Sequence, residues 1–80
     1  MAQQSTKRSA QDKTGVSNVV FDIMTMLNNK LQGVAAMEMY KEDAERSNDQ
    51  EVMNLINDLE KKELQDINKL KDVLKQRLTA

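Results

Sequence analysis

The sequence contains no cysteine, no histidine and no proline among its 80 residues. Without cysteine, neither a disulfide framework nor a thiolate metal site can form. Histidine is the commonest transition-metal ligand and the usual general base near neutral pH, so its absence removes most enzyme chemistry. Carboxylates, lysines, hydroxyls and a single tyrosine, Tyr40, are left to build a site. We therefore expect a protein that is not an enzyme.

An excess of one charge and a long apolar run are also lacking. The 12 basic and 13 acidic residues are intermixed and give a net charge of -1, so no basic face is available to bind phosphates. The apolar runs are far shorter than the roughly 20 residues that span a bilayer. Residues 1–15 contain no apolar stretch that is typical of a secretory signal. We expect a cytoplasmic protein that binds neither nucleic acid nor membranes.

The chain divides into a polar tail and a helical region. Residues 1–15 have almost no large apolar side chains and cannot bury enough surface to offset their ordering entropy, which predicts a disordered tail. Residues 16–80 contain no proline, and their only glycine is Gly33. This region therefore predicts one all-α domain.

A short polar segment interrupts the helical region. Ser47, Asn48 and Asp49 are residue types that end one helix and cap the next, and Asn48 precedes Glu51 by the spacing of a capping box. We predict a helix over 16–46, a turn over 47–49 and a helix over 49–78. Each helix would be about 45 Å long at 1.5 Å per residue.

Apolar residues recur at alternating intervals of four and three in both helices. In the first helix this inward line is Val19, Ile23, Met26, Lys30, Gly33, Met37, Tyr40 and Ala44. In the second it is Val52, Ile56, Leu59, Glu63, Asp66, Leu70, Val73 and Arg77. The spacing predicts an antiparallel two-helix hairpin. Further apolar residues widen both stripes beyond what one partner helix covers, which predicts a homodimer, or a higher even oligomer, built as a four-helix bundle.

Three charged residues interrupt these inward lines at one level of the hairpin. Lys30 lies about as far before the turn as Glu63 lies after it, and Asp66 is one helical turn further on. Residues equidistant from the turn meet in an antiparallel hairpin, so we predict a buried polar cluster of Lys30, Glu63 and Asp66. A carboxylate that is buried alone costs several kcal/mol, whereas a paired one is tolerated.

The segment "YKEDAERSNDQEVMNLINDLEKKELQDINKL" resembles the helical hairpin of ferritin-like carboxylate proteins of the rubrerythrin and encapsulated-ferritin kind. In that family a first-helix Glu and a second-helix Glu-x-x-His hold two iron ions at the centre of a four-helix bundle. With Ala44 placed on the family's alanine before the turn, Glu63 matches the Glu of Glu-x-x-His. Asp66 then replaces the His, and Lys30 replaces the first-helix Glu.

Two functions remain compatible with these residues. In the first, Lys30 supplies the positive charge that the metal supplies in the family, and the ferritin-like bundle has a structural or protein-interaction role, with an unidentified protein partner possible. In the second, Glu63 and Asp66 of two chains provide four carboxylates for a di-metal centre. The resemblance implies iron for such a centre, and an oxygen-only ligand set favours Mg or Mn. We expect the first of these functions and no cofactor.

Overall fold

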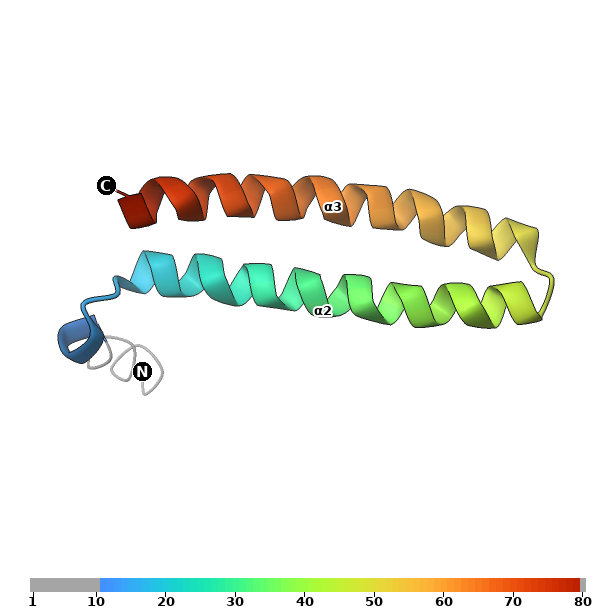
Figure 1. Ribbon diagram of the computed structural model, residues 1–80, viewed down its shortest axis with the longest axis horizontal. Helices are drawn as coiled ribbons and strands as arrows, with labels where there is room; N and C mark the ends of the chain where they lie inside the picture. The colour runs from blue at the N-terminus through green and yellow to red at the C-terminus, as the bar shows by residue number, and fades with distance from the viewer. Residues whose placement is uncertain (1–10, 80) are drawn as a thin grey trace.

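Two long antiparallel helices joined by a tight turn form the molecule. The computed structural model describes residues 11–79. Helix α2 runs from Asn18 to Arg46 and helix α3 from Gln50 to Thr79. The two helices lie side by side along their whole length, with the turn at one end and the described chain ends at the other (Figure 1). The predicted all-helical hairpin is confirmed for the described residues, which contain no strand.

The helix ends are fixed by side-chain and backbone caps. Ser17 caps α2 by accepting a hydrogen bond from the Val20 amide at 3.1 Å, so this helix begins two residues later than the predicted Val16. At its other end, Asn48 adopts a positive φ of 54°, and the amides of Asn48 and Asp49 donate back to Glu45 and Ala44. Asparagine is one of the few residues that tolerates this left-handed conformation.

Asp49 begins the second helix. Its Oδ1 accepts a hydrogen bond from the Val52 amide at 3.1 Å. The capping-box prediction had given this role to Asn48, but a residue with positive φ ends the preceding helix and cannot also have the extended backbone of an N-cap. Helix α3 accordingly starts at Gln50, one residue later than predicted.

The contact between the helices is rotated from the predicted inward lines, because alternate members of each line are replaced by the next residue and the others are kept. On α2 the buried and half-buried positions include the series Val20, Ile23, Leu27, Lys30, Val34, Met37, Lys41 and Ala44. On α3 they include the series Met53, Ile56, Glu60, Glu63, Ile67, Leu70 and Leu74. Three of the eight residues of the first predicted line and four of the eight of the second, including Val19, Tyr40 and Leu59, are instead exposed. Each apolar stripe is broader than one helix contact, and the hairpin uses only one side of it.

The core of the single hairpin is small. In the part of the chain that the structure describes, only Val20, Ile23, Ala44, Ile56 and Ile67 are buried hydrophobic residues, and no side chain is completely enclosed. A chain of this size is marginal without disulfides, metal or a partner subunit. The hairpin therefore has little core of its own to stabilise two helices of this length.

Residues 11–15 of the predicted tail are among the described residues. Residues 11–14 form a helical turn, and the Gln11 side chain accepts a hydrogen bond from the Asn18 amide at 2.9 Å. Local backbone and side-chain hydrogen bonds thus order this segment without an apolar core. Residues 1–10, the rest of the predicted tail, lie outside the described residues. Over the described range, neither helix has a window apolar enough to cross a membrane.

Candidate functional site

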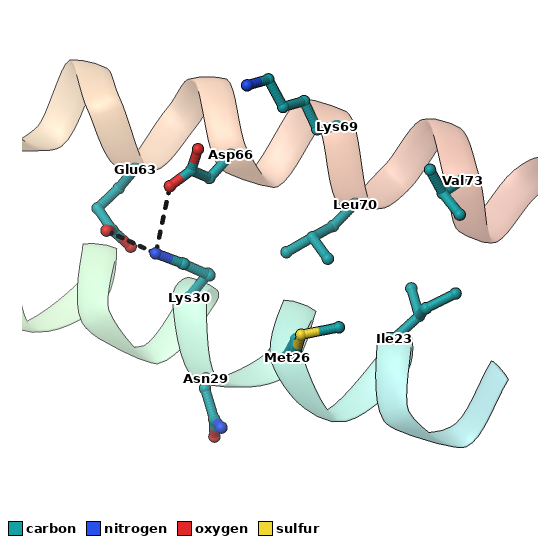
Figure 2. Close-up of a pocket in the computed structure, with 9 residues that line it drawn as sticks. All are labelled: Ile23, Met26, Asn29, Lys30, Glu63, Asp66, Lys69, Leu70 and Val73. Carbon is teal, nitrogen blue, oxygen red and sulfur yellow. Dashed lines mark hydrogen bonds and ion pairs between the residues drawn. The ribbon is translucent and has the colours of Figure 1, made fainter. Parts of the chain in front are cut away.

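A lysine and two carboxylates connect the two helices near the middle of the hairpin. The Lys30 ammonium on α2 donates to Glu63 Oε1 at 2.9 Å and to Asp66 Oδ2 at 3.3 Å on α3. Figure 2 shows the Lys30 nitrogen held between the two carboxylates. Glu63 and Asp66 lie three residues apart on α3, which places both on the side of that helix that turns towards Lys30.

The cluster is only partly shielded from solvent in the single hairpin. The side chains of Lys30, Glu63 and Asp66 are 35%, 22% and 41% exposed. One side of the cluster remains open in the single chain, so its burial in the core of a dimer stays a prediction. Burial of this cluster requires another surface to cover that side.

An open groove of about 750 Å³ borders the cluster. Its apolar residues are Ile23 and Met26 of α2 and Leu70 and Val73 of α3. Its polar residues are Asn29, Lys30, Glu63, Asp66 and Lys69. In Figure 2 the apolar side chains lie together on the side of the cluster away from Glu63, while Asn29 and Lys69 point outwards at opposite rims. The groove is thus a mainly apolar surface with the ion-pair cluster of Lys30 at one end.

The electrostatics of Lys30 favour an ion pair over a nucleophile. The hydrogen bond that Lys30 donates to Glu63, followed by the one it donates to Asp66, raises the pKa of Lys30 above its usual value. The ammonium form is therefore favoured, and a lysine nucleophile needs the opposite shift. The geometry gives Lys30 the role of a fixed positive charge.

The metal-binding interpretation has two acidic candidates, Glu63 and Asp66, and the Lys30 nitrogen contacts both of them. Within residues 11–79 no group of three or more acidic, histidine or cysteine residues is arranged to hold a metal ion. An ammonium group in contact with both carboxylates also repels a cation at that point. The two carboxylates of one chain do not constitute a metal site.

A second ion-pair cluster lies nearer the turn and was missed from the sequence. Lys41 donates to Glu60 at 2.6 Å across the helices and to Glu38 at 3.3 Å within α2. Glu60 is more enclosed than any member of the Lys30 cluster, with 15% of its side chain exposed, and its Oε2 is buried without a hydrogen-bond partner. Both residues lie in charge-rich stretches of the sequence, which are typical of solvated helix faces. The signal in the sequence is the spacing of seven residues, which places two residues on the same side of a helix. Lys41 lies seven residues after Val34, and Glu60 lies seven residues before Ile67.

The Lys41 cluster makes the stability of the fold depend on pH in the acidic range. The hydrogen bond from Lys41 lowers the pKa of Glu60 below its usual value. A carboxylate with a depressed pKa stabilises the fold fully above the ordinary glutamate pKa, and this contribution is lost as the pH falls through the depressed value. We expect the melting temperature of the protein to fall as the pH decreases below about 4.3, the ordinary glutamate value.

Thermal melts of wild type and Glu60→Gln between neutral pH and about pH 2 would check this dependence. The variant has no carboxylate to protonate at this position, so its melting temperature should fall less over the acidic range. Glu42→Gln, at an exposed position, serves as the control and should retain the wild-type slope. Equal slopes for wild type and Glu60→Gln would contradict the assignment.

The fold and the site together define a small helical hairpin with interhelical ion pairs. No protein-family model matches the chain, and neither the curated proteins nor the solved structures include one with significant similarity to it.

Proposed function

We propose that this protein is a non-enzymatic assembly module, in which two hairpins associate through the groove-bearing side into a four-helix bundle. The observation that carries the proposal is the incomplete burial of the apolar residues on that side. We call this side the groove face. On α2 it consists of Val19, Met26, Gly33 and Tyr40. On α3 it consists of Val52, Leu59, Asp66 and Val73.

The groove face is too apolar and too exposed for a lone hairpin. Val19, Met26 and Tyr40 are 52%, 50% and 56% exposed, and Leu59 of α3 is 46% exposed. Soluble monomers rarely expose a contiguous apolar patch of this kind. A second hairpin placed on the groove face would cover it and would supply the core that the single chain lacks.

The opposite side of the hairpin has a different composition. Its α2 residues, at the same seven-residue spacing, are Met24, Leu31, Glu38 and Glu45. Its α3 residues are Asn57, Leu64, Lys71 and Leu78. Charged and amide side chains interrupt the apolar ones there, as on an ordinary solvated surface. The difference between the two sides favours the groove face as the surface of association.

The Lys30 cluster has a role in this assembly. Its open side lies on the groove face, so a second copy would complete its burial. A buried ion pair adds little net stability, but it can fix the register and the choice of partner. We propose that the cluster specifies this association, at the level where the ferritin-like resemblance has a di-metal centre.

Two leucines of α3 provide a matched test. Leu59 on the groove face and Leu64 on the opposite side are both 46% exposed in the single chain. Leu59→Glu should convert the dimer to a monomer, because it places a carboxylate in the bundle core. Leu64→Glu should leave a dimer. Light scattering coupled to size exclusion measures the mass, which is 9.1 kDa for one chain and twice that for the dimer.

A wild-type mass of one chain at all accessible concentrations would refute the self-association. Dissociation by Leu64→Glu but not by Leu59→Glu would place the interface on the other side. Circular dichroism of both variants should show that the helices persist, which separates loss of association from loss of folding.

A further inference from the structure

One methionine lies on the groove face. The methionines among the described residues are Met24, Met26, Met37, Met39 and Met53, and of these only Met26 belongs to that face. Met26 lines the groove together with the Lys30 cluster, and Figure 2 shows its thioether on α2 between Lys30 and Ile23. In the single hairpin 50% of Met26 is exposed. Small reagents in water therefore reach this side chain in the single chain.

The other methionines provide internal controls for Met26. Met24 lies on the opposite side of the hairpin and is 49% exposed, almost the same fraction as Met26. Met39 is 66% exposed and belongs to neither of the two sides, whereas Met37 and Met53 are half-buried. A reagent that reacts with exposed thioethers meets Met24 and Met26 equally in a single chain. It meets them unequally once a second copy covers the groove face.

Oxidation of Met26 would place a polar oxygen on the groove face. Hydrogen peroxide converts a methionine thioether into its sulfoxide. The sulfur lone pair attacks one peroxide oxygen, the O–O bond breaks and an S–O bond forms. The sulfur is oxidised and the peroxide is reduced, and the departing hydroxide takes the proton of the transferred oxygen and leaves as water. A flexible apolar side chain thereby becomes a polar hydrogen-bond acceptor.

The donors beside Met26 in the groove are already engaged or point away. The Lys30 ammonium, one helical turn further along α2, donates to Glu63 and Asp66. Asn29 points outwards at the rim of the groove (Figure 2). A sulfoxide oxygen that accepts from Lys30 would take this donor from a carboxylate, and one that does not would be buried unpaired in the dimer. A two-fold interface repeats this cost.

We infer that Met26 is an oxidation site that controls self-association, its sulfoxide holding the hairpin as a monomer; this inference rests on the self-association proposed above. A second copy covers Met26, so peroxide reaches the sulfur only in the dissociated chain. The oxidised chain then associates poorly, and monomers accumulate for as long as the oxidant is present. Methionine sulfoxide reductases reverse this modification, so reduction restores the dimer.

Peptide mass spectrometry after a short exposure to hydrogen peroxide measures the oxidation rate at each methionine. The rate at Met26 should fall once the protein concentration exceeds the dimer dissociation constant, whereas the rate at Met24 should stay constant. In Leu59→Glu, which prevents dimerisation, Met26 should react at one rate at every concentration. A constant Met26 rate in wild-type protein that light scattering shows to be dimeric would overturn the inference. A monomeric mass before any oxidation would instead refute the proposed function.

The mass of the oxidised protein tests the consequence of the reaction. Oxidation should raise the dimer dissociation constant of the wild type about a hundredfold, since two polar oxygens enter the interface. Met26→Leu keeps an apolar side chain without sulfur and should remain a dimer after the same treatment. If the oxidised wild type stays as dimeric as oxidised Met26→Leu, the inference fails and the proposed function stands.

A polar substitution provides a readout that needs no oxidant. Met26→Gln has a side chain of similar length with a polar end, and it should dissociate the dimer without peroxide. Met24→Gln makes the same change at an equally exposed position on the opposite side and should leave the dimer intact. Circular dichroism should show that the helices persist in both variants. Equal dimer dissociation constants for Met26→Gln and Met24→Gln would also overturn the inference.

Discussion

In the proposed dimer, replacing Lys30 with methionine is expected to raise the dissociation constant by about two orders of magnitude or more. The substitution keeps a side chain of similar length but removes the positive charge that contacts Glu63 and Asp66 at 2.9 and 3.3 Å. Two carboxylates would then enter the dimer core without a counter-charge, and removing one partner of a buried pair is strongly destabilising. Analytical ultracentrifugation over a dilution series measures the constant.

The same substitution should be far less harmful when the carboxylates are removed with it. Lys30→Met combined with Glu63→Leu replaces the closest ion pair with apolar side chains, so the double variant should recover much of the lost affinity. Lys61→Met, at an exposed position of α3, controls for the loss of a positive charge and should behave as wild type. If Lys30→Met also behaves as wild type, the cluster stays solvated in the assembled protein and does not lie in its core.

The cluster is the part of the site that sequence reasoning could locate. A continuous helix has a fixed rise and rotation per residue, so a reliable turn at 47–49 determines which residues of the two helices share a level. Lys30 and Glu63 are nearly equidistant from that turn, and their hydrogen bond in the structure joins residues 33 positions apart. A charged residue within an apolar stripe is also easier to assign to the helix contact than an apolar residue is, because few other charged residues lie in that stripe.

The rotation of each helix about its axis could not be predicted so well. Val19 and Val20 are adjacent valines. A series of residues at seven-residue spacing begins at each of them, one continuing through Met26 and the other through Leu27, and both series have the apolar pattern of a core-facing side. Nothing in the apolar pattern says which series faces the other helix and which faces away. The structure places Val20 in the contact and leaves Val19 52% exposed. A shift of one residue turns a side chain by about 100°, so a small error in phase exchanges the two surfaces.

The Lys41 cluster was missed for the same reason. Lys41 and Glu60 lie outside the predicted inward lines, which pass through Tyr40 and Leu59 one residue earlier. Once the contact is rotated, both charged residues fall between the helices. Their 2.6 Å hydrogen bond pairs the Lys41 ammonium with one of the two Glu60 carboxylate oxygens, as buried polar groups generally require. In charge-rich stretches, the pattern alone does not distinguish a lysine at the interface from one in solvent.

The two clusters lie on different sides of the hairpin contact, so we expect them to have different roles. Lys41 also binds Glu38, which belongs to the side opposite the groove face, so all three charged groups of this cluster come from one chain. The Lys30 cluster opens on the groove face instead. We expect the Lys41 cluster to set the register of α2 against α3, and the Lys30 cluster to set the register of one hairpin against another.

Ile67→Ala is expected to be the most damaging large-to-small substitution in α3, lowering the free energy of unfolding by about 2–4 kcal/mol. Ile67 is 6% exposed and is one of five buried hydrophobic residues among those described, so few others can compensate for its loss. Stabilities of small domains are only about 5–15 kcal/mol, and this loss is a large fraction of that range. Urea denaturation monitored by circular dichroism measures it.

Leu64→Ala is the matched control, because it also truncates an aliphatic side chain of α3 but at a position that is 46% exposed. Its expected effect is below about 1 kcal/mol. If the hairpin is stable only as a dimer, the denaturation midpoint of the wild type and both variants should rise with protein concentration. Equal losses for Ile67→Ala and Leu64→Ala would mean that the two helices do not pack through Ile67. A midpoint independent of concentration would mean that the small core of one hairpin suffices to hold it folded.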